Sequence, residues 1–167
     1  MIAKDLQPLS VVEDEGFRDF VKNLDPRFQI PTRKTLRNNL LPKLYEDVKG
    51  ELKTQLQSVS SVALTTDMWT SSANMSFLAV TIHFWNSDCC QLVTKVLDCS
   101  NFIGSHTSSA INAAISDAIQ SFEINGKVSN ITADGAANMK KAIQDGGFNY
   151  LHCFGHAIDL VVKEAIR

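Results

Sequence analysis

Two kinds of hydrophobic pattern divide the chain near residue 60. Up to that point, apolar residues recur at three-to-four spacing, which is typical of amphipathic helices. One such stripe predicts a helix over 13–24, and a second series begins after Thr32, a residue type that suits a helix N-cap. The members of the second series are four residues apart: Leu36, Leu40, Leu44, Val48, Leu52 and Leu56.

Prolines interrupt this helical region. Pro26 and Pro31 separate the two segments, and Pro42 predicts a kink or a restart within the second, because proline lacks the backbone N–H of a helix interior. Two interpretations stay open. The region forms a helical hairpin packed on the rest of the protein, or it is an arm that links domains or associates with a partner chain.

From Ser61 the pattern changes to that of β-strands. Residues 61–67, 76–85 and 90–100 are β-branched, continuously apolar or alternating runs, and turn formers occupy 86–88. Short connections between consecutive strands predict an antiparallel meander.

The remainder predicts helices alternating with strands. Ser and Thr residues at 105–109 suit the start of a helix, and Gly146-Gly147 suits the end of another. The expected order is βββ-α-β-α-β-α, an α/β fold with a mixed sheet at 61–167, preceded by a helical region at 1–60. The later elements are expected at 111–122, 124–132, 136–143, 148–153 and 155–166.

Composition argues against several classes of protein. The chain of 167 residues is 44% hydrophobic and 20% charged, with a formal net charge of -2, so it lacks the basic balance of a self-sufficient DNA-binding module. It has no apolar run of membrane-spanning length and no secretory signal. The spacing of its four cysteines indicates a reducing compartment. Because the last helical pattern has no stop signal, we expect a fragment of a longer protein.

Two aspartates are the candidates for chemistry. Asp67 is expected to end the first strand and Asp134 the fourth, and adjacent strands would bring both carboxylates to one site. Such oxygen ligands suit Mg²⁺ or Mn²⁺, which activate water or a hydroxyl in phosphodiester chemistry. The alternative roles are structural: Asp67 binds nearby backbone donors, and Asp134 caps the following helix. A carboxylate can fill both roles.

Three local segments extend this interpretation to a family. The segments "LTTDMWTS" (64–71), "NITADGAANM" (130–139) and "HCFGHAIDLVV" (152–162) resemble three blocks of the hAT transposases, including those that carry a BED-type zinc finger. The upstream segment 8–36 resembles the helical region before the catalytic core of these proteins. The resemblance covers nearly the whole chain, and it implies a ribonuclease H-like core.

The resemblance also implies roles for individual residues. Asp67 matches the first acid of the family's Asp-Asp-Glu metal site, and Asp134 matches the second. Cys153 and His156 match a C-x-x-H block that is structural or lies near the bound DNA. The third acid, the BED zinc finger and the dimerisation region lie outside this chain in the family. Asp159 stands where the family more often has Asn.

A DNA-associated nuclear fragment that is catalytically incomplete is therefore the expected function. The alternative is part of an active transposase that cleaves and transfers DNA strands, and a weaker one is an unrelated α/β domain with a nucleotide or small-ligand site. The expected cofactor is Mg²⁺ or Mn²⁺, with zinc only in a BED finger outside the chain, because Cys153 and His156 lack a second ligand pair. The expected partners are DNA and a second copy of the full-length protein, with no membrane.

Overall fold

The computed structural model describes residues 2–166 of the chain, which divides into two compact units, residues 1–52 and 53–167. Helix α3 (Leu41–Gln57) runs across this division. The expected division into 1–60 and 61–167 stays a prediction. No helix in residues 2–166 is long and apolar enough to cross a membrane.

The first unit is helical, as the spacing of its apolar residues predicts. Helix α1 forms with its apolar stripe largely open to solvent: Phe20 is 60% exposed and Leu24 is 70% exposed. Thr32 is the N-cap of α2, and its Oγ1 accepts a hydrogen bond from the N–H of Thr35 at 3.1 Å. The elements before α3 are η1 (Leu9–Glu13), α1 (Glu15–Leu24), α2 (Arg33–Thr35) and η2 (Leu36–Leu40).

Pro42 interrupts the helix as expected. It is the second residue of α3, and the turn immediately before it, η2, is a π-helix rather than an α-helix. Because proline has no N–H, it cannot donate to the carbonyl of Asn38 four residues earlier, and a wider π turn accommodates the change.

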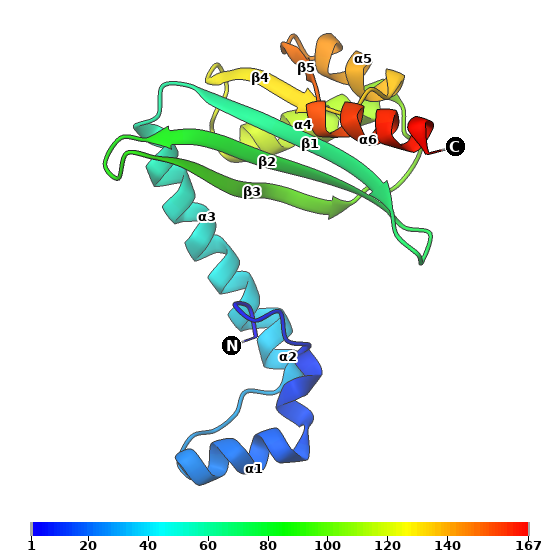
Figure 1. Ribbon diagram of the computed structural model, residues 1–167. Helices are drawn as coiled ribbons and strands as arrows, with labels where there is room; N and C mark the ends of the chain where they lie inside the picture. The colour runs from blue at the N-terminus through cyan, green and yellow to red at the C-terminus, as the bar shows by residue number, and fades with distance from the viewer. Residues whose placement is uncertain (1, 167) are drawn as a thin grey trace. The chain divides into compact units, whose positions relative to one another are not determined.

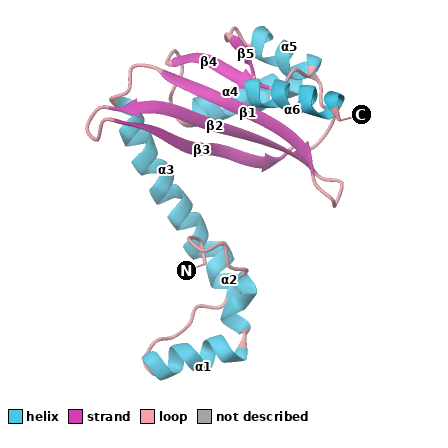
Figure 2. Cartoon of the chain, in the orientation of Figure 1, coloured by secondary structure: helices cyan, strands magenta, loops and turns pink. Residues whose placement is uncertain are grey.

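The second unit contains a five-stranded mixed sheet in the order β3-β2-β1-β4-β5 (Figures 1 and 2). The first three strands form the predicted antiparallel meander, and β4 and β5 run parallel to β1. The predicted α/β class and its order βββ-α-β-α-β-α are confirmed. The elements are β1 (Val62–Thr70), β2 (Ser76–Asn86), β3 (Gln91–Asn101), α4 (Ser108–Ser121), β4 (Val128–Ala133), α5 (Ala137–Asp145), β5 (Tyr150–His152) and α6 (Phe154–Ala165).

The core of this unit lies between the sheet and two helices. Alternate residues of a strand share a face, so the buried residues of β1 and β2 form one apolar surface. Helices α4 and α5 bury their own apolar residues, and Asn112 of α4 donates to the carbonyl of Ala142 in α5 at 2.8 Å. Helix α6 lies on the other face of the sheet (Figure 1) and buries none of its described residues.

Lys127 stabilises the end of α3, and its replacement is expected to lower stability. Its Nζ donates to the carbonyls of Leu56 and Gln57 at 2.7 and 3.1 Å, where a helix leaves carbonyls without partners. Lys127→Met is expected to lower the free energy of unfolding by about 1–2 kcal/mol, because the charged donor is lost. Urea denaturation measures the change. Lys141→Met, which removes an exposed lysine of α5, is the matched control, and equal midpoints for the two variants would contradict the assignment.

Candidate active site

Asp67 and Asp134 occupy equivalent positions beyond one strand pair. The parallel pairing of β1 with β4 ends at Thr65 and Thr132, and each aspartate follows two residues later. Residues two apart on a strand point to the same face, so Asp67 shares the face of Thr65, whereas Asp134 is the first residue after β4. Both aspartates therefore lie at the same end of this strand pair.

The expectation that Asp67 ends its strand is wrong. Strand β1 continues to Thr70 because it stays paired with β2, from Asp67 opposite Ala79 to Thr70 opposite Ser76. The antiparallel hairpin therefore sets the end of β1, whereas the parting of β1 from β4 opens the site.

Both aspartates also make the local contacts expected of them, although the expected cap is wrong in detail. Oδ1 of Asp67 accepts from the N–H of Met68 at 2.9 Å. Oδ1 of Asp134 accepts from the N–H of Ala136 at 3.1 Å, but Ala136, rather than Asp134, is the N-cap residue of α5. The hydrogen bond of Asp134 thus closes a turn before the helix. It uses only Oδ1, so Oδ2 remains available to accept another contact.

All four residues singled out in the sequence line one cavity of about 320 Å³. Cys153 reaches it as the N-cap residue of α6, where its N–H donates to the carbonyl of Ala133 at 2.8 Å and joins the helix start to the end of β4. His156 follows in the first turn of α6. The lining consists of Thr65, Thr66, Asp67, Ala79, Thr81, Thr132, Ala133, Asp134, Cys153 and His156.

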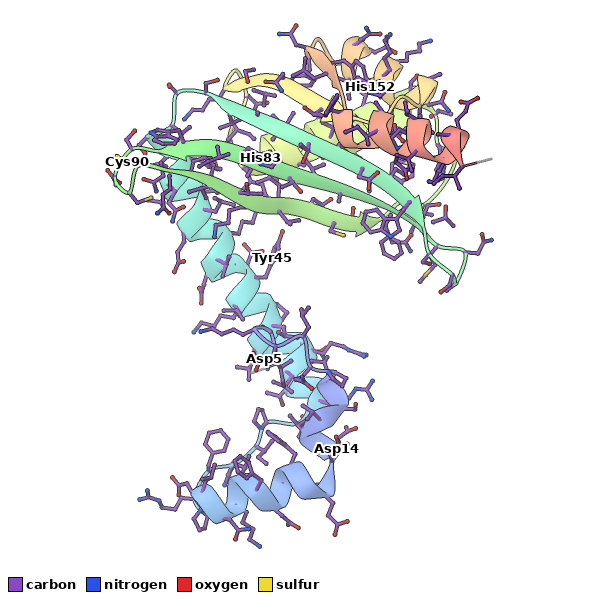
Figure 3. The ribbon with its side chains drawn as sticks, viewed as in Figure 1. Asp5, Asp14, Tyr45, His83, Cys90 and His152 are labelled. Carbon is purple, nitrogen blue, oxygen red and sulfur yellow. The ribbon has the colours of Figure 1, made fainter. Side chains whose placement is uncertain are left out.

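The threonines of this lining were not predicted as site residues from the sequence. The segments "LTTD" and "NITAD" each place a threonine two residues before the aspartate, and that shared spacing was the available signal. Thr65 also begins a hydrogen-bonded row across three strands. Its Oγ1 lies 3.1 Å from Nε2 of His83 on β2, whose Nδ1 lies 3.0 Å from Oγ1 of Thr94 on β3. Figure 3 labels His83 on this sheet.

The donor set fits a magnesium or manganese ion better than zinc. Within residues 2–166, no group of three His, Cys, Asp or Glu side chains is arranged to hold a metal ion, whereas a zinc site takes three or four such ligands. Mg²⁺ differs from zinc because one or two carboxylates bind it while water and phosphate fill the remaining positions. Asp67 and Asp134 match that requirement, with hard oxygen donors at one cavity.

Comparison with known proteins agrees with this geometry. Residues 65–145 match the model of the ZBED1 RNase-like domain. The chain is 31% identical to an AC transposase of Zea mays over 175 residues, which cover 95% of this chain and 21% of that protein. It is 24% identical to zinc finger BED domain-containing protein 6 of Homo sapiens over 180 residues, covering 98% of this chain and 18% of the human protein.

The fold and the matches together define a ribonuclease H-like core. They identify the chain as a transposase-derived protein of the hAT family, which includes relatives with BED zinc fingers. The chain spans about a fifth, or less, of the length of these curated relatives.

Proposed function

We propose that this chain is the first part of the catalytic core of a transposase-derived, DNA-associated nuclear protein, and that Asp67 and Asp134 bind one Mg²⁺ or Mn²⁺ ion. One observation carries the proposal: each aspartate follows the last β1–β4 pair by two residues, and both line one cavity. The similarity to an AC transposase and to BED zinc finger proteins supports DNA as the partner.

The ion would supply Lewis-acid chemistry at a phosphodiester. The residues of this chain would bind the ion and line the cavity around it. Asp67 and Asp134 would hold the ion, and the contacts of their Oδ1 atoms with the backbone would limit the rotation of each carboxylate. Cys153 and His156 lie at the cavity where DNA would approach. The net charge of -2 agrees with DNA affinity that comes mainly from other parts of the full-length protein, including a BED zinc finger and a dimer contact.

We further propose that the chain on its own does not cleave DNA. Two carboxylates line the cavity, and residues 2–166 offer no third ligand in metal-binding geometry. A supercoiled plasmid incubated with the purified chain and Mn²⁺ is therefore expected to remain supercoiled on an agarose gel. Nicking by the wild-type chain that disappears in Asp67→Ala would overturn this part of the proposal.

An active transposase is the second candidate, and the presence of both aspartates at one cavity favours it. A longer form of the protein that supplies a third acid would then nick DNA with Mn²⁺. The same plasmid assay with that longer form decides between the two. Nicking that requires Asp67 and Asp134 would favour the enzyme, and its absence would favour a host-adopted regulatory protein.

A further inference from the structure

Two side chains of β5 hold the turn that carries Asp134, although neither lines the cavity. Tyr150 donates its hydroxyl hydrogen to the backbone carbonyl of Asp134, with 2.7 Å between the oxygens. His152 lies so close to Gly135 that a Cβ built there would meet its Nε2 at 2.9 Å. Strand β5 pairs in parallel with β4, so its alternate residues reach the residues that follow β4. Figure 3 labels His152 at this end of the sheet.

We propose that Tyr150 and His152 are positioning residues, which fix the Asp134-Gly135 turn so that the Asp134 carboxylate faces the cavity lined by Asp67. The inference rests on the proposed metal site and adds to it two residues that touch neither ion nor DNA. Partners of this kind orient a ligand, and removing one typically weakens metal binding by about 10–100-fold.

The environment of Tyr150 suits a fixed donor. Its ring is half-buried, and Lys140 of α5 places its Nζ 5.8 Å from the ring centroid. Burial raises the pKa of Tyr150 above its ordinary value of 10.0, and electrostatic interactions with Asp134 and Cys153 raise that pKa further. The hydroxyl therefore keeps its proton at neutral pH and donates to the carbonyl of Asp134.

The contact between His152 and Gly135 is steric. Gly135 has no positive φ, so its backbone accepts alanine, and the His152 ring is what excludes a Cβ. Two contacts hold the ring: its Nδ1 lies 3.1 Å from the carbonyl oxygen of Cys153, and the ring is nearly perpendicular to that of Tyr150, with 6.4 Å between the centroids. Displacing His152 therefore disturbs the second positioning residue as well.

Tyr150→Phe tests the hydrogen bond, with Tyr45→Phe as the matched control. These are the two tyrosines of the chain, and Tyr45 is an exposed residue of α3. Titration of free Mn²⁺ by electron paramagnetic resonance is expected to show about tenfold weaker binding for Tyr150→Phe and unchanged binding for Tyr45→Phe. Equal affinities in the two variants would overturn the role of Tyr150.

A second pair of variants tests His152 and remains decisive if Tyr150→Phe fails to fold. Gly135→Ala is expected to weaken Mn²⁺ binding, because the new Cβ displaces the His152 ring. His152→Ala is also expected to weaken Mn²⁺ binding, because the turn then loses the ring that packs against Gly135. Unchanged affinity in either Gly135→Ala or His152→Ala would overturn the role of His152.

Hydrogen exchange separates a failure of this inference from a failure of the proposed metal site. The amide of Ala136, which binds Oδ1 of Asp134, is expected to exchange faster in metal-free Tyr150→Phe than in Tyr45→Phe. If the wild-type chain binds no Mn²⁺, the proposed metal site is wrong. The exchange rate of the Ala136 amide still shows whether Tyr150 fixes the Asp134-Gly135 turn. An unchanged rate contradicts the inference whether or not the chain binds Mn²⁺.

Discussion

Replacing Ile131 by alanine is expected to lower the free energy of unfolding by about 2–5 kcal/mol. Ile131 has no exposed surface and lies in β4, between Leu64 of β1 and Tyr150 of β5. Alanine lacks the buried methyl groups of isoleucine, so the substitution leaves a cavity. Because β4 is paired on both sides, the surrounding sheet cannot easily move to fill it. The free energy of unfolding of a small domain is only about 5–15 kcal/mol, so this loss is a large fraction of the total stability.

Ile103→Ala is the matched control for this prediction. Ile103 is 89% exposed, and its truncation is expected to change the free energy of unfolding by less than about 0.5 kcal/mol. Chemical denaturation followed by circular dichroism measures both variants. A loss for Ile131→Ala no larger than that for Ile103→Ala would mean that β4 is not at the centre of a packed sheet.

Asp134→Asn is expected to abolish the stabilisation of the chain by Mn²⁺. At a Mn²⁺ concentration tenfold above Kd, binding stabilises the wild-type fold by about 1.4 kcal/mol. That corresponds to a rise in melting temperature of about 3–6 °C for a chain of this size. Asparagine keeps an oxygen that can accept from the N–H of Ala136, so the turn survives while the ligand charge is lost.

Differential scanning fluorimetry with increasing Mn²⁺ measures this effect. Asp145→Asn, which neutralises an exposed acid at the end of α5, serves as the control and is expected to keep the full shift. An equal Mn²⁺-induced shift in Asp134→Asn and the wild-type chain would remove Asp134 from the metal site.

The order of strands and helices was predictable because each segment of the second unit has a clear period. Strand β2 is buried at alternate residues, and the apolar residues of α4 recur at three and four positions. Helix starts were predictable where a side chain caps them, as Thr32 and Thr107 do through the N–H of Thr35 and Ala110. These are local effects, and local sequence carries them.

Features that depend on a neighbouring strand were not predictable. The end of β1 lies beyond Asp67 because β2 continues to pair with it, and no residue near Asp67 signals that pairing. The predicted stripe on α1 correctly indicated a helix, but the spacing does not say whether a stripe is covered, and Phe20 and Leu24 are exposed.

The candidate site was predictable in its acids and not in its surroundings. Asp67 and Asp134 stood out because both follow β-branched runs, and the family resemblance added Cys153 and His156. The contribution of Tyr150 depends on the parallel pairing of β5 with β4, which joins residues 16 positions apart in a hydrogen bond to the carbonyl of Asp134. Spacing along the chain does not reveal such a contact.

Paramagnetic broadening by Mn²⁺ tests the central claim most directly. In a two-dimensional amide spectrum of the wild-type chain, substoichiometric Mn²⁺ is expected to broaden the signals of Asp67 and Asp134 and of the threonines beside them first. Neither Asp67→Asn nor Asp134→Asn is expected to show this pattern. Broadening centred on another acidic segment, such as Glu13–Glu15, or broadening that persists in both variants, would contradict a metal site at the parting of β1 and β4.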